Sequence, residues 1–314
     1  MTLMGDGIAL RDSKEMTLER AISNHTTDGQ QVILGGVGHY NRPAAAVREL
    51  LRQGRRDLEI FSSPISGYDV DLLIGAGAVR RIWTNMNFDY LGMAPNFRHR
   101  VLRGEFEAVV CDEATLFGGL RATIEGLPYH PVRSILGSDV VKASPIAEEY
   151  VGPTGDRLVA IKALQPQVAI LHAQEGDRYG NLRYAGSAFL DLTMAKASDV
   201  VIATVDRLVP HASFIADPKR TDVPGFLVTA VVEVPFGAHP CASQGRYLID
   251  ERHLDQYMTA AHASAVEGSD DPAFDHYLKT FVHEPVDHFT YLERAAGIAH
   301  LHALSRAATP EVDL

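Results

Sequence analysis

The stretch PQVAILHAQEGDRYGNLRYAG, residues 166–186, decides the fold of this chain. Its apolar run, Val168 to Leu171, predicts a buried strand. The run ends at His172 and leads into a polar turn bracketed by Gly176 and Gly180. An open α/β sheet binds its ligand where a strand delivers polar groups at its carboxyl end. We therefore expect a ligand site at the end of this strand.

On both sides of this stretch, short β-like runs alternate with amphipathic helices. This alternation predicts an α/β fold with an open, mostly parallel sheet and helices on both faces. The expected strands are 31–34, 58–61, 81–84, 106–111, 168–171, 200–204 and a longer one at 225–234. The expected helices are one that opens at Pro43 and stops at Gly54, then 69–75, 96–102, 115–124, 190–197 and the region after about 253.

Composition limits the class of protein. A net charge of -11 argues against nucleic acid or an anionic membrane as the main partner. The two cysteines, Cys111 and Cys241, lie far apart and form no Cys-x-x-Cys pair, which indicates a reducing compartment and no thiolate zinc site. The first residues carry charges without an apolar core, and no stretch reaches about 18 apolar residues. We expect a soluble cytoplasmic protein without a signal peptide.

A glycine-rich loop, GGVGHYNRP at 35–43, lies between a predicted strand and a predicted helix. Such a loop lets backbone N–H groups approach an anion at the helix amino end. The spacing of its glycines is not that of the dinucleotide-binding Gly-x-Gly-x-x-Gly motif. Arg42 at the helix start is a candidate contact for a phosphate or carboxylate. The alternative is that the loop is a tight turn only.

The segment CDEATLFGGL, 111–120, follows another predicted strand and opens a helix. Asp112 suits a capping role there, because acidic residues favour the helix amino end. Glu113 is the candidate for chemistry, since a partly shielded carboxylate at the strand ends can act as a base or a nucleophile. The pair Gly118 and Gly119 allows another group to approach the helix closely.

Two histidines are candidate site residues. His172 ends the central strand, and His239 lies in the loop VPFGAHPCASQG, 234–245. Either could polarise a carbonyl or relay a proton, and either could instead brace the structure through hydrogen bonds. No metal-binding spacing connects them with acidic residues, so we expect no metal. No Gly-x-Ser-x-Gly elbow is present, and Ser62 and Ser63 precede a proline in a turn, which argues against a serine hydrolase.

Several collinear stretches from about residue 16 to 298 resemble one family: the α subunit of family I CoA-transferases, most closely the glutaconate CoA-transferases. The stretches that carry the resemblance are GGVGHYNRPAAAVRELLRQG, DVDLLIG, GLPYHPVRS, PQVAILHAQEGDRYGNLRYAG and DPKRTDVPGFLVTAVVEVPFGAHP. The resemblance implies an open α/β fold of the NagB/RpiA-like type. It also implies one domain over 16–300, between an N-terminal extension, 1–15, and a C-terminal tail, 301–314.

In this family the active site lies at the junction with a β subunit of the same architecture. The acyl-CoA is attacked by a glutamate of that β subunit, which forms a glutamyl-CoA thioester, so that CoA moves between carboxylates without ATP. The resemblance thus implies a β-subunit partner, an α2β2 assembly, an acyl-CoA substrate and no tightly bound cofactor beyond the CoA that the substrate carries. The candidate substrate-binding residues are Gly36, Gly38, Arg42, Ser63, Asn85, Gly118, Gly119, His172 and His239.

Glu113 departs from the transferase pattern, which has glutamine at the matching position. A glutamate there resembles the steroid-ring-opening relatives, which hydrolyse a cyclic dione CoA thioester and rely on an α-subunit glutamate. Glu113 would then act as a base for carbon–carbon cleavage. Three functions remain open from the sequence: the α chain of a CoA-transferase, a ring-opening CoA-thioester hydrolase, and a non-catalytic module that binds CoA or a sugar phosphate.

Overall fold

The structure is a computed structural model, and it describes residues 3–4, 8–9, 12–62, 65–84, 94–265 and 272–308. Two of the candidate site residues, Ser63 and Asn85, lie outside the described residues. The last part of the predicted tail, residues 309–314, also lies outside them.

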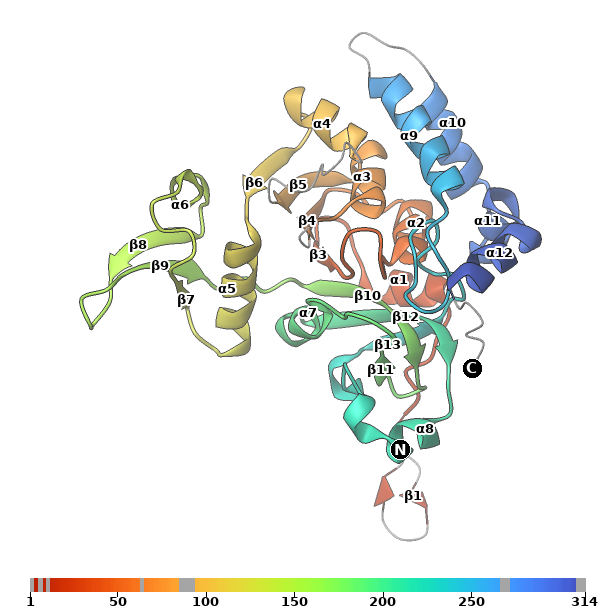
Figure 1. Ribbon diagram of the computed structural model, residues 1–314, viewed down its shortest axis with the longest axis horizontal. Coiled ribbons are helices and arrows are strands. Elements are labelled where there is room, and N and C mark those ends of the chain that lie inside the picture. Colours follow the sequence, from red (N-terminus) through yellow and green to blue (C-terminus); the bar gives the residue numbers. More distant parts are fainter. Residues whose placement is uncertain are drawn as a thin grey trace.

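An eight-stranded sheet forms the centre of the molecule (Figure 1). Its main path runs β13-β12-β10-β3-β4-β5-β6, and every neighbouring pair on that path is parallel. Strand β11 pairs antiparallel with the end of β10. The predicted open, mostly parallel sheet is therefore confirmed. The strands are β3 Gln31–Leu34, β4 Leu58–Ser62, β5 Val79–Thr84, β6 Glu107–Val110, β10 Val168–Gly176, β11 Leu182–Arg183, β12 Val200–Leu208 and β13 Ala230–Glu233.

Helices cover both faces of this sheet. Successive side chains of a strand point to opposite faces, so Val32 and Ile170 enter one core while Ile33 and Leu171 enter the other. The first core is closed by α1 Leu18–His25, α2 Ala44–Arg52, α3 Tyr68–Gly75, α4 Pro95–Leu102, α9 Glu251–Ala265, α10 Ala273–Leu278, the π-helix η4 Lys279–His283, α11 His288–Ala295 and α12 Ile298–Ala308. The second is closed by α5 Glu113–Ile124 and α7 Asp191–Ala197.

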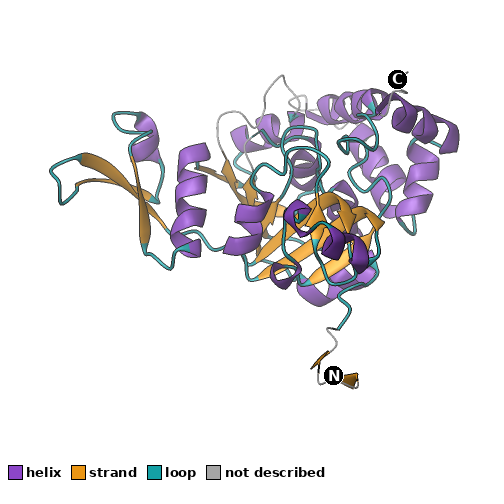
Figure 2. Ribbon diagram, turned by 60° about the horizontal axis from the view of Figure 1, so that its bottom comes forward, coloured by secondary structure: helices purple, strands orange, loops and turns teal. Residues whose placement is uncertain are grey.

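A small antiparallel sheet projects from the body beside α5, and we call it the arm (Figures 1 and 2). Its strands are β7 Tyr129–Val132, β8 Ala147–Val151 and β9 Arg157–Lys162, with the short helix α6 Asp139–Ala143. The central strand of the arm, β9, contributes Val159 and Ile161 to the core against α5. The arm was not predicted from the sequence, because its strands show only weak apolar alternation and are interrupted by proline, glycine and charged residues.

One predicted strand is wrong. The segment 225–234 is not one long strand: it begins as a 3-10 turn, η3 Gly225–Leu227, and only then enters the sheet as β13. The cause is a close approach of Gly225 to the turn at Asn181. The N–H of Gly225 donates to Asn181 Oδ1 at 2.8 Å, and a Cβ on Gly225 would lie 2.5 Å from the carbonyl oxygen of Tyr179. These contacts hold the backbone of Gly225 against that turn, so the extended strand begins only later in the segment.

The segment at 14–16 and the last helix also contact the rest of the molecule. Residues at 14–16 lie along the outer edge of β13, where Met16 N–H donates to the Val231 carbonyl and Val231 N–H donates to the Lys14 carbonyl. Earlier in the chain, the described N-terminal residues form two short antiparallel strands, β1 Leu3–Met4 and β2 Ile8–Ala9. Elsewhere, a short helix, α8 His211–Ala216, and a 3-10 turn, η2 Pro218–Arg220, follow β12. The predicted boundary at residue 300 falls inside α12, whose Leu301 is buried.

Candidate functional site

The carboxyl ends of the parallel strands lie together at one edge of the sheet. The predicted site residues belong to segments that follow these strands. The chain moves from β3 outward to β6, then returns to the other side of β3 through β10. The strand order therefore reverses between β3 and β10. Open α/β sheets bind their ligands outside the carboxyl ends of the strands at such a switch point. The glycine loop after β3 and the polar end of β10 both lie there.

The N–H groups of the glycine loop are bonded within the chain. Gly36 N–H donates to Asp191 Oδ1 at 2.9 Å, and Gly38 N–H donates to the Ile65 carbonyl at 2.7 Å. Gly36 has a φ of +80°, and a Cβ there would lie 2.5 Å from the Tyr40 carbonyl oxygen. These contacts support the tight-turn interpretation of the loop. A contact between a substrate and Gly36 or Gly38 stays a prediction.

Asp191 holds this loop from the first turn of α7. Its side chain is fully buried, and Oδ2 accepts a hydrogen bond of 2.7 Å from Tyr184 OH while Oδ1 accepts the Gly36 N–H. Burial raises the pKa of Asp191 to about 6, against the opposing effect of these hydrogen bonds. Asp191 was not predicted as a site residue, because in the sequence it looks like an ordinary acidic residue at the start of a helix.

Arg42 is fully buried and forms an ion pair with Asp69 on α3. Its Nε and Nη2 donate to Asp69 Oδ2 at 2.9 and 2.7 Å, and Nη1 donates to the Gly36 carbonyl at 3.2 Å. These bonds join the glycine loop to α3. They engage the guanidinium inside the protein, so the structure favours a bracing role for Arg42 over the expected contact with a ligand anion.

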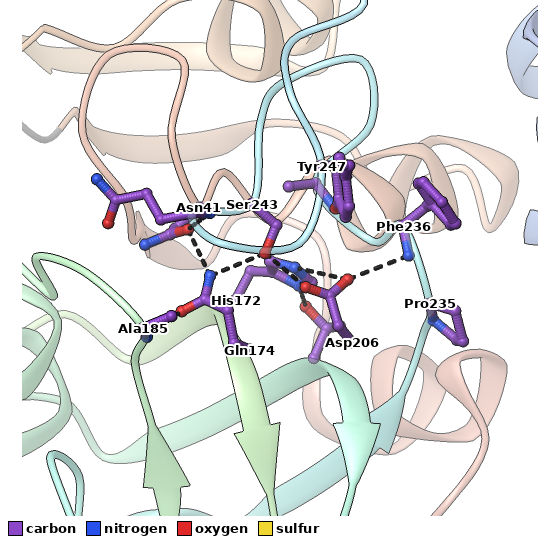
Figure 3. A network of polar contacts seen from close by, with 12 residues as sticks. Asn41, His172, Gln174, Ala185, Asp206, Pro235, Phe236, Ser243 and Tyr247 are labelled. Atoms are coloured by element: carbon purple, nitrogen blue, oxygen red, sulfur yellow. Dashed lines mark hydrogen bonds and ion pairs between the residues drawn. The ribbon is translucent and has the colours of Figure 1, made fainter. Parts of the chain in front are cut away.

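His172 lies in a buried polar network with residues from β12 and the loops at the carboxyl edge (Figure 3). Thr204 Oγ1 donates to the Leu171 carbonyl at 3.1 Å, so it accepts from His172 Nδ1, 2.9 Å away. His172 Nε2 faces Asp206 Oδ1 at 3.5 Å and has no hydrogen-bond partner among the described residues. The ring has no exposed surface. The bracing alternative for His172 is therefore the one that the geometry supports.

His239 lies in the loop at 234–245, two residues after Gly237, where an added Cβ would lie 2.8 Å from His172 Cε1. Its fully buried ring bonds Tyr291 OH through Nδ1 at 2.9 Å and Asp250 through Nε2 at 3.0 Å, beneath the C-terminal helices. Burial lowers the pKa of His239, although Asp250 opposes this effect. Both ring nitrogens of His239 are bonded inside the protein, so a bracing role is supported here too.

The amino end of α5 presents two carboxylates with opposite roles. Asp112 caps the helix, accepting the Thr115 N–H at 2.9 Å and the Thr115 hydroxyl at 2.8 Å. This confirms the capping role. Glu113, the next residue, is exposed, and its side-chain carboxylate makes no hydrogen bond or ion pair with the described residues. The helix amino end favours its negative charge. Among the candidate residues, Glu113 is thus the charged group that remains available for chemistry.

Gly118 and Gly119 are buried on the opposite side of α5, against the arm. A Cβ on Gly118 would lie 3.1 Å from Ile161, and one on Gly119 would lie 2.6 Å from Leu164 Cγ. The group that approaches the helix closely is therefore the chain itself. This explains why glycines occur there without a ligand.

Two further findings concern the described part of the chain. Within it, no group of three or more His, Cys, Asp or Glu side chains is arranged to hold a metal ion. In the same residues, no helix is long and apolar enough to cross a membrane.

The chain belongs to the coenzyme A transferase family: residues 15–234 match the family model. It is similar to a glutaconate CoA-transferase chain of Acidaminococcus fermentans, with 31% identity over 90% of this chain and 92% of that protein. The crystal structure of that transferase matches with a TM-score of 0.85 and 30% identity, over 93% of this chain and 95% of that one. The predicted family, the predicted fold and the assignment to the α type of chain are confirmed.

Two other relatives broaden the comparison. The IpdA chain of the cholesterol ring-cleaving hydrolase of Mycobacterium tuberculosis is 30% identical over 79% of this chain and 88% of that protein. An uncharacterized protein of Archaeoglobus fulgidus is 33% identical over 93% of this chain, and the chain spans 64% of the length of that relative. Relatives of nearly equal identity thus carry names for different reactions, so overall similarity does not choose between transfer and hydrolysis.

Proposed function

We propose that this chain is the α subunit of a heteromeric enzyme that moves CoA between an acyl-CoA and a carboxylate. The observation that carries the proposal is the match to the glutaconate CoA-transferase chain over nearly the whole of both proteins, in sequence and in fold. The partner would be a β subunit of the same family, in an α2β2 assembly. CoA would enter as part of the substrate, with no tightly bound cofactor.

The chemistry of this proposal divides between the two chains. A glutamate of the partner would attack the thioester and carry CoA as a glutamyl-CoA thioester, which conserves the thioester energy. The carboxyl edge between β3 and β10 would form this chain's side of the cleft. The braced glycine loop suits that task, because a rigid wall keeps the reacting groups aligned at little entropic cost.

A second function is favoured by one specific observation, the exposed and unpartnered carboxylate of Glu113. A glutamate at the strand edge whose carboxylate makes no hydrogen bond or ion pair with the described residues can take a proton from water or from an acidic carbon. The second candidate is therefore hydrolysis of a cyclic dione CoA thioester with Glu113 as the base. The similarity to the IpdA chain of the cholesterol ring-cleaving hydrolase supports it.

One experiment separates the two functions. The complex of this chain with its co-purified partner is incubated with glutaconyl-CoA and acetate, and both chains are weighed by intact mass spectrometry. Transfer predicts a CoA adduct on the partner chain and formation of acetyl-CoA. Hydrolysis predicts no adduct, and opening of the ring of a cyclic dione CoA thioester: one water is added, a ring carbon–carbon bond breaks and the CoA thioester is kept, in a reaction that requires Glu113. A chain that purifies alone and turns over neither substrate would contradict both.

A further inference from the structure

Gln174 ties together three loops at the carboxyl edge of the sheet. It is the seventh residue of β10, and its side chain is 1% exposed. Its Nε2 donates to Asn41 Oδ1 at 2.7 Å and to Ser243 Oγ at 2.8 Å, while its Oε1 accepts the Ala185 N–H at 2.9 Å (Figure 3). The glycine loop, the loop after β11 and the loop at 234–245 are thus bonded to a single amide.

The directions of these hydrogen bonds specify an amide at position 174. The Ser243 hydroxyl donates its proton to Asp206 Oδ2, so Ser243 Oγ can only accept from Gln174. Asp206 Oδ1 also accepts the Phe236 N–H at 3.1 Å. Asn41 Oδ1 is an acceptor as well. Gln174 therefore supplies two donors to two acceptors, and a glutamate of the same shape would supply none when ionised.

Asn41 connects this network to the exposed tip of the glycine loop. It is buried and has a φ of +56°, a left-handed conformation that costs energy for a residue other than glycine. Its N–H donates to the Ala242 carbonyl at 2.8 Å, and its side chain bonds Gln174. The two preceding residues form the tip: His39 is half-buried, and Tyr40 is 48% exposed.

We propose that Gln174 is a positioning residue for the reaction: by bonding Asn41 and Ser243, it fixes the tip of the glycine loop, His39 and Tyr40, where the acyl-CoA is bound. This inference rests on the proposed function, because it assumes that acyl-CoA binds at the switch point between β3 and β10. Gln174 itself touches no substrate. Its effect passes through the loop that it holds, and so it acts on substrate binding and alignment together.

The test is Gln174→Glu, studied at two pH values. The new carboxyl group faces His172 on its own strand and Asp206 on β12, whose carboxylate Tyr247 also contacts. Ionised at pH 8, it removes both donors and adds a negative charge near Asp206, and we expect kcat/KM to fall by about tenfold to 100-fold. Protonated near pH 5.5, it regains one donor, and we expect kcat/KM to recover to within about threefold of wild type at that pH.

A second readout does not depend on knowing the substrate. Hydrogen exchange of the peptides covering 35–43 and 234–245 is measured by mass spectrometry against wild type at the same pH. We expect faster exchange in Gln174→Glu at pH 8 and wild-type exchange at pH 5.5. The matched control is Gln167→Glu at the other end of β10, where the side-chain oxygen accepts the Gln31 N–H and a carboxylate can do the same. It should change neither readout.

The outcomes separate this inference from the proposed function. Unchanged loop exchange in Gln174→Glu, or a loss of kcat/KM that does not recover at low pH, overturns the positioning role. Wild-type complex that neither exchanges nor hydrolyses acyl-CoA overturns the proposed function, while the exchange data still decide whether Gln174 holds the loops. Wild-type loop exchange combined with wild-type kcat/KM overturns the inference alone.

Discussion

The glycine loop and the amino end of α5 both follow strands at the same sheet edge, but they use their charges in opposite ways. In the glycine loop, Arg42 is fully buried and bonded to Asp69, and the N–H groups of Gly36 and Gly38 have partners in the chain. At α5, Glu113 is exposed and has no partner among the described residues. A buried charge requires a partner, whereas a hydrated one does not. The charges of the first region therefore stabilise the structure, whereas the carboxylate of the second is accessible to solvent.

The largest expected effect concerns the amino end of α5. In Glu113→Gln, any hydrolytic ring opening of a cyclic dione CoA thioester by the complex should fall by about 10²–10⁴-fold, because the general base is lost. CoA exchange between carboxylates should persist. The free energy of unfolding should fall by no more than about 1 kcal/mol, because the carboxylate of Glu113 makes no hydrogen bond or ion pair with the described residues and only its interaction with the helix amino end is lost. Glu148→Gln, an exposed carboxylate on the arm, is the control. Undiminished hydrolysis in Glu113→Gln would remove Glu113 from the mechanism.

The next effect concerns the glycine loop. Arg42→Met should lower the free energy of unfolding by about 3–5 kcal/mol, because it leaves Asp69 as a buried charge without its partner. The double variant Arg42→Met/Asp69→Leu should recover much of this loss. The matched control is Arg56→Ala, whose ion pair with Asp28 is exposed and worth less than about 1 kcal/mol. Urea unfolding measures all three. A wild-type unfolding midpoint in Arg42→Met would show that the pair does not brace the loop.

A smaller effect tests the contact between α5 and the arm. Gly119→Ala should destabilise the protein by about 1–3 kcal/mol, because the new Cβ would lie 2.6 Å from Leu164 Cγ. Adding Leu164→Ala should relieve the clash and leave only the loss of the Leu164 packing. Gly118→Ala should cost less, because its Cβ would lie 3.1 Å from Ile161. Thermal melts compare the variants, and equal melting temperatures for Gly119→Ala and wild type would contradict the close approach.

The smallest effects concern the pH dependence of stability, to which buried histidines and a buried aspartate contribute in opposite directions. Burial lowers the pKa values of His239, His253 and His288, so the unfolded chain binds more protons below about pH 6.5, and stability falls with falling pH. Replacing one of them, as in His253→Phe, should reduce the loss between pH 7.5 and 6 by less than about 1 kcal/mol. Urea midpoints at the two pH values measure it. The same pH dependence in wild type and variant would exclude this role for His253.

Asp191 should act in the opposite direction. Burial raises its pKa to about 6, so the folded state keeps a proton that the unfolded state has lost, and this contribution to stability disappears as pH rises through about 6. Asp191→Asn should therefore gain stability relative to wild type as pH rises from 5 to 7.5, as measured by urea midpoints. A constant difference between the two proteins over that range would mean that Asp191 does not titrate there.

The periodic parts of the fold could be predicted because short-range patterns report them. The apolar run after Gln167 predicted the start of β10, and the residues around Pro43 predicted α2. The arm escaped prediction because a half-exposed antiparallel sheet carries a weak pattern. The strand expected from Gly225 was wrong because a contact with Asn181, 44 residues earlier in the chain, outweighed the local β preference of its valines.

Local sequence carries less information about the site than about the fold, for a physical reason. Sequence places a polar residue at a strand end, but it does not show whether a partner lies within hydrogen-bond distance. The hydrogen-bond partner of Arg42, Asp69, lies 27 residues away in the sequence, and the partner of Gln174, Asn41, lies 133 residues away. Once paired, such groups stabilise the structure and are no longer available to a ligand.

The sequence by itself determined the family, the parallel sheet and the position of Glu113 at the start of α5, because motifs and periodicity are properties of the local chain. Only the tertiary structure decided which polar groups are bound inside the protein and which remain free. The stretch 166–186 shows both levels: its apolar half predicted the strand, while the roles of His172 and Gln174 depend on residues from distant loops. Hydrogen bonds act over about 3 Å in space, and the chain brings their partners together only when it folds.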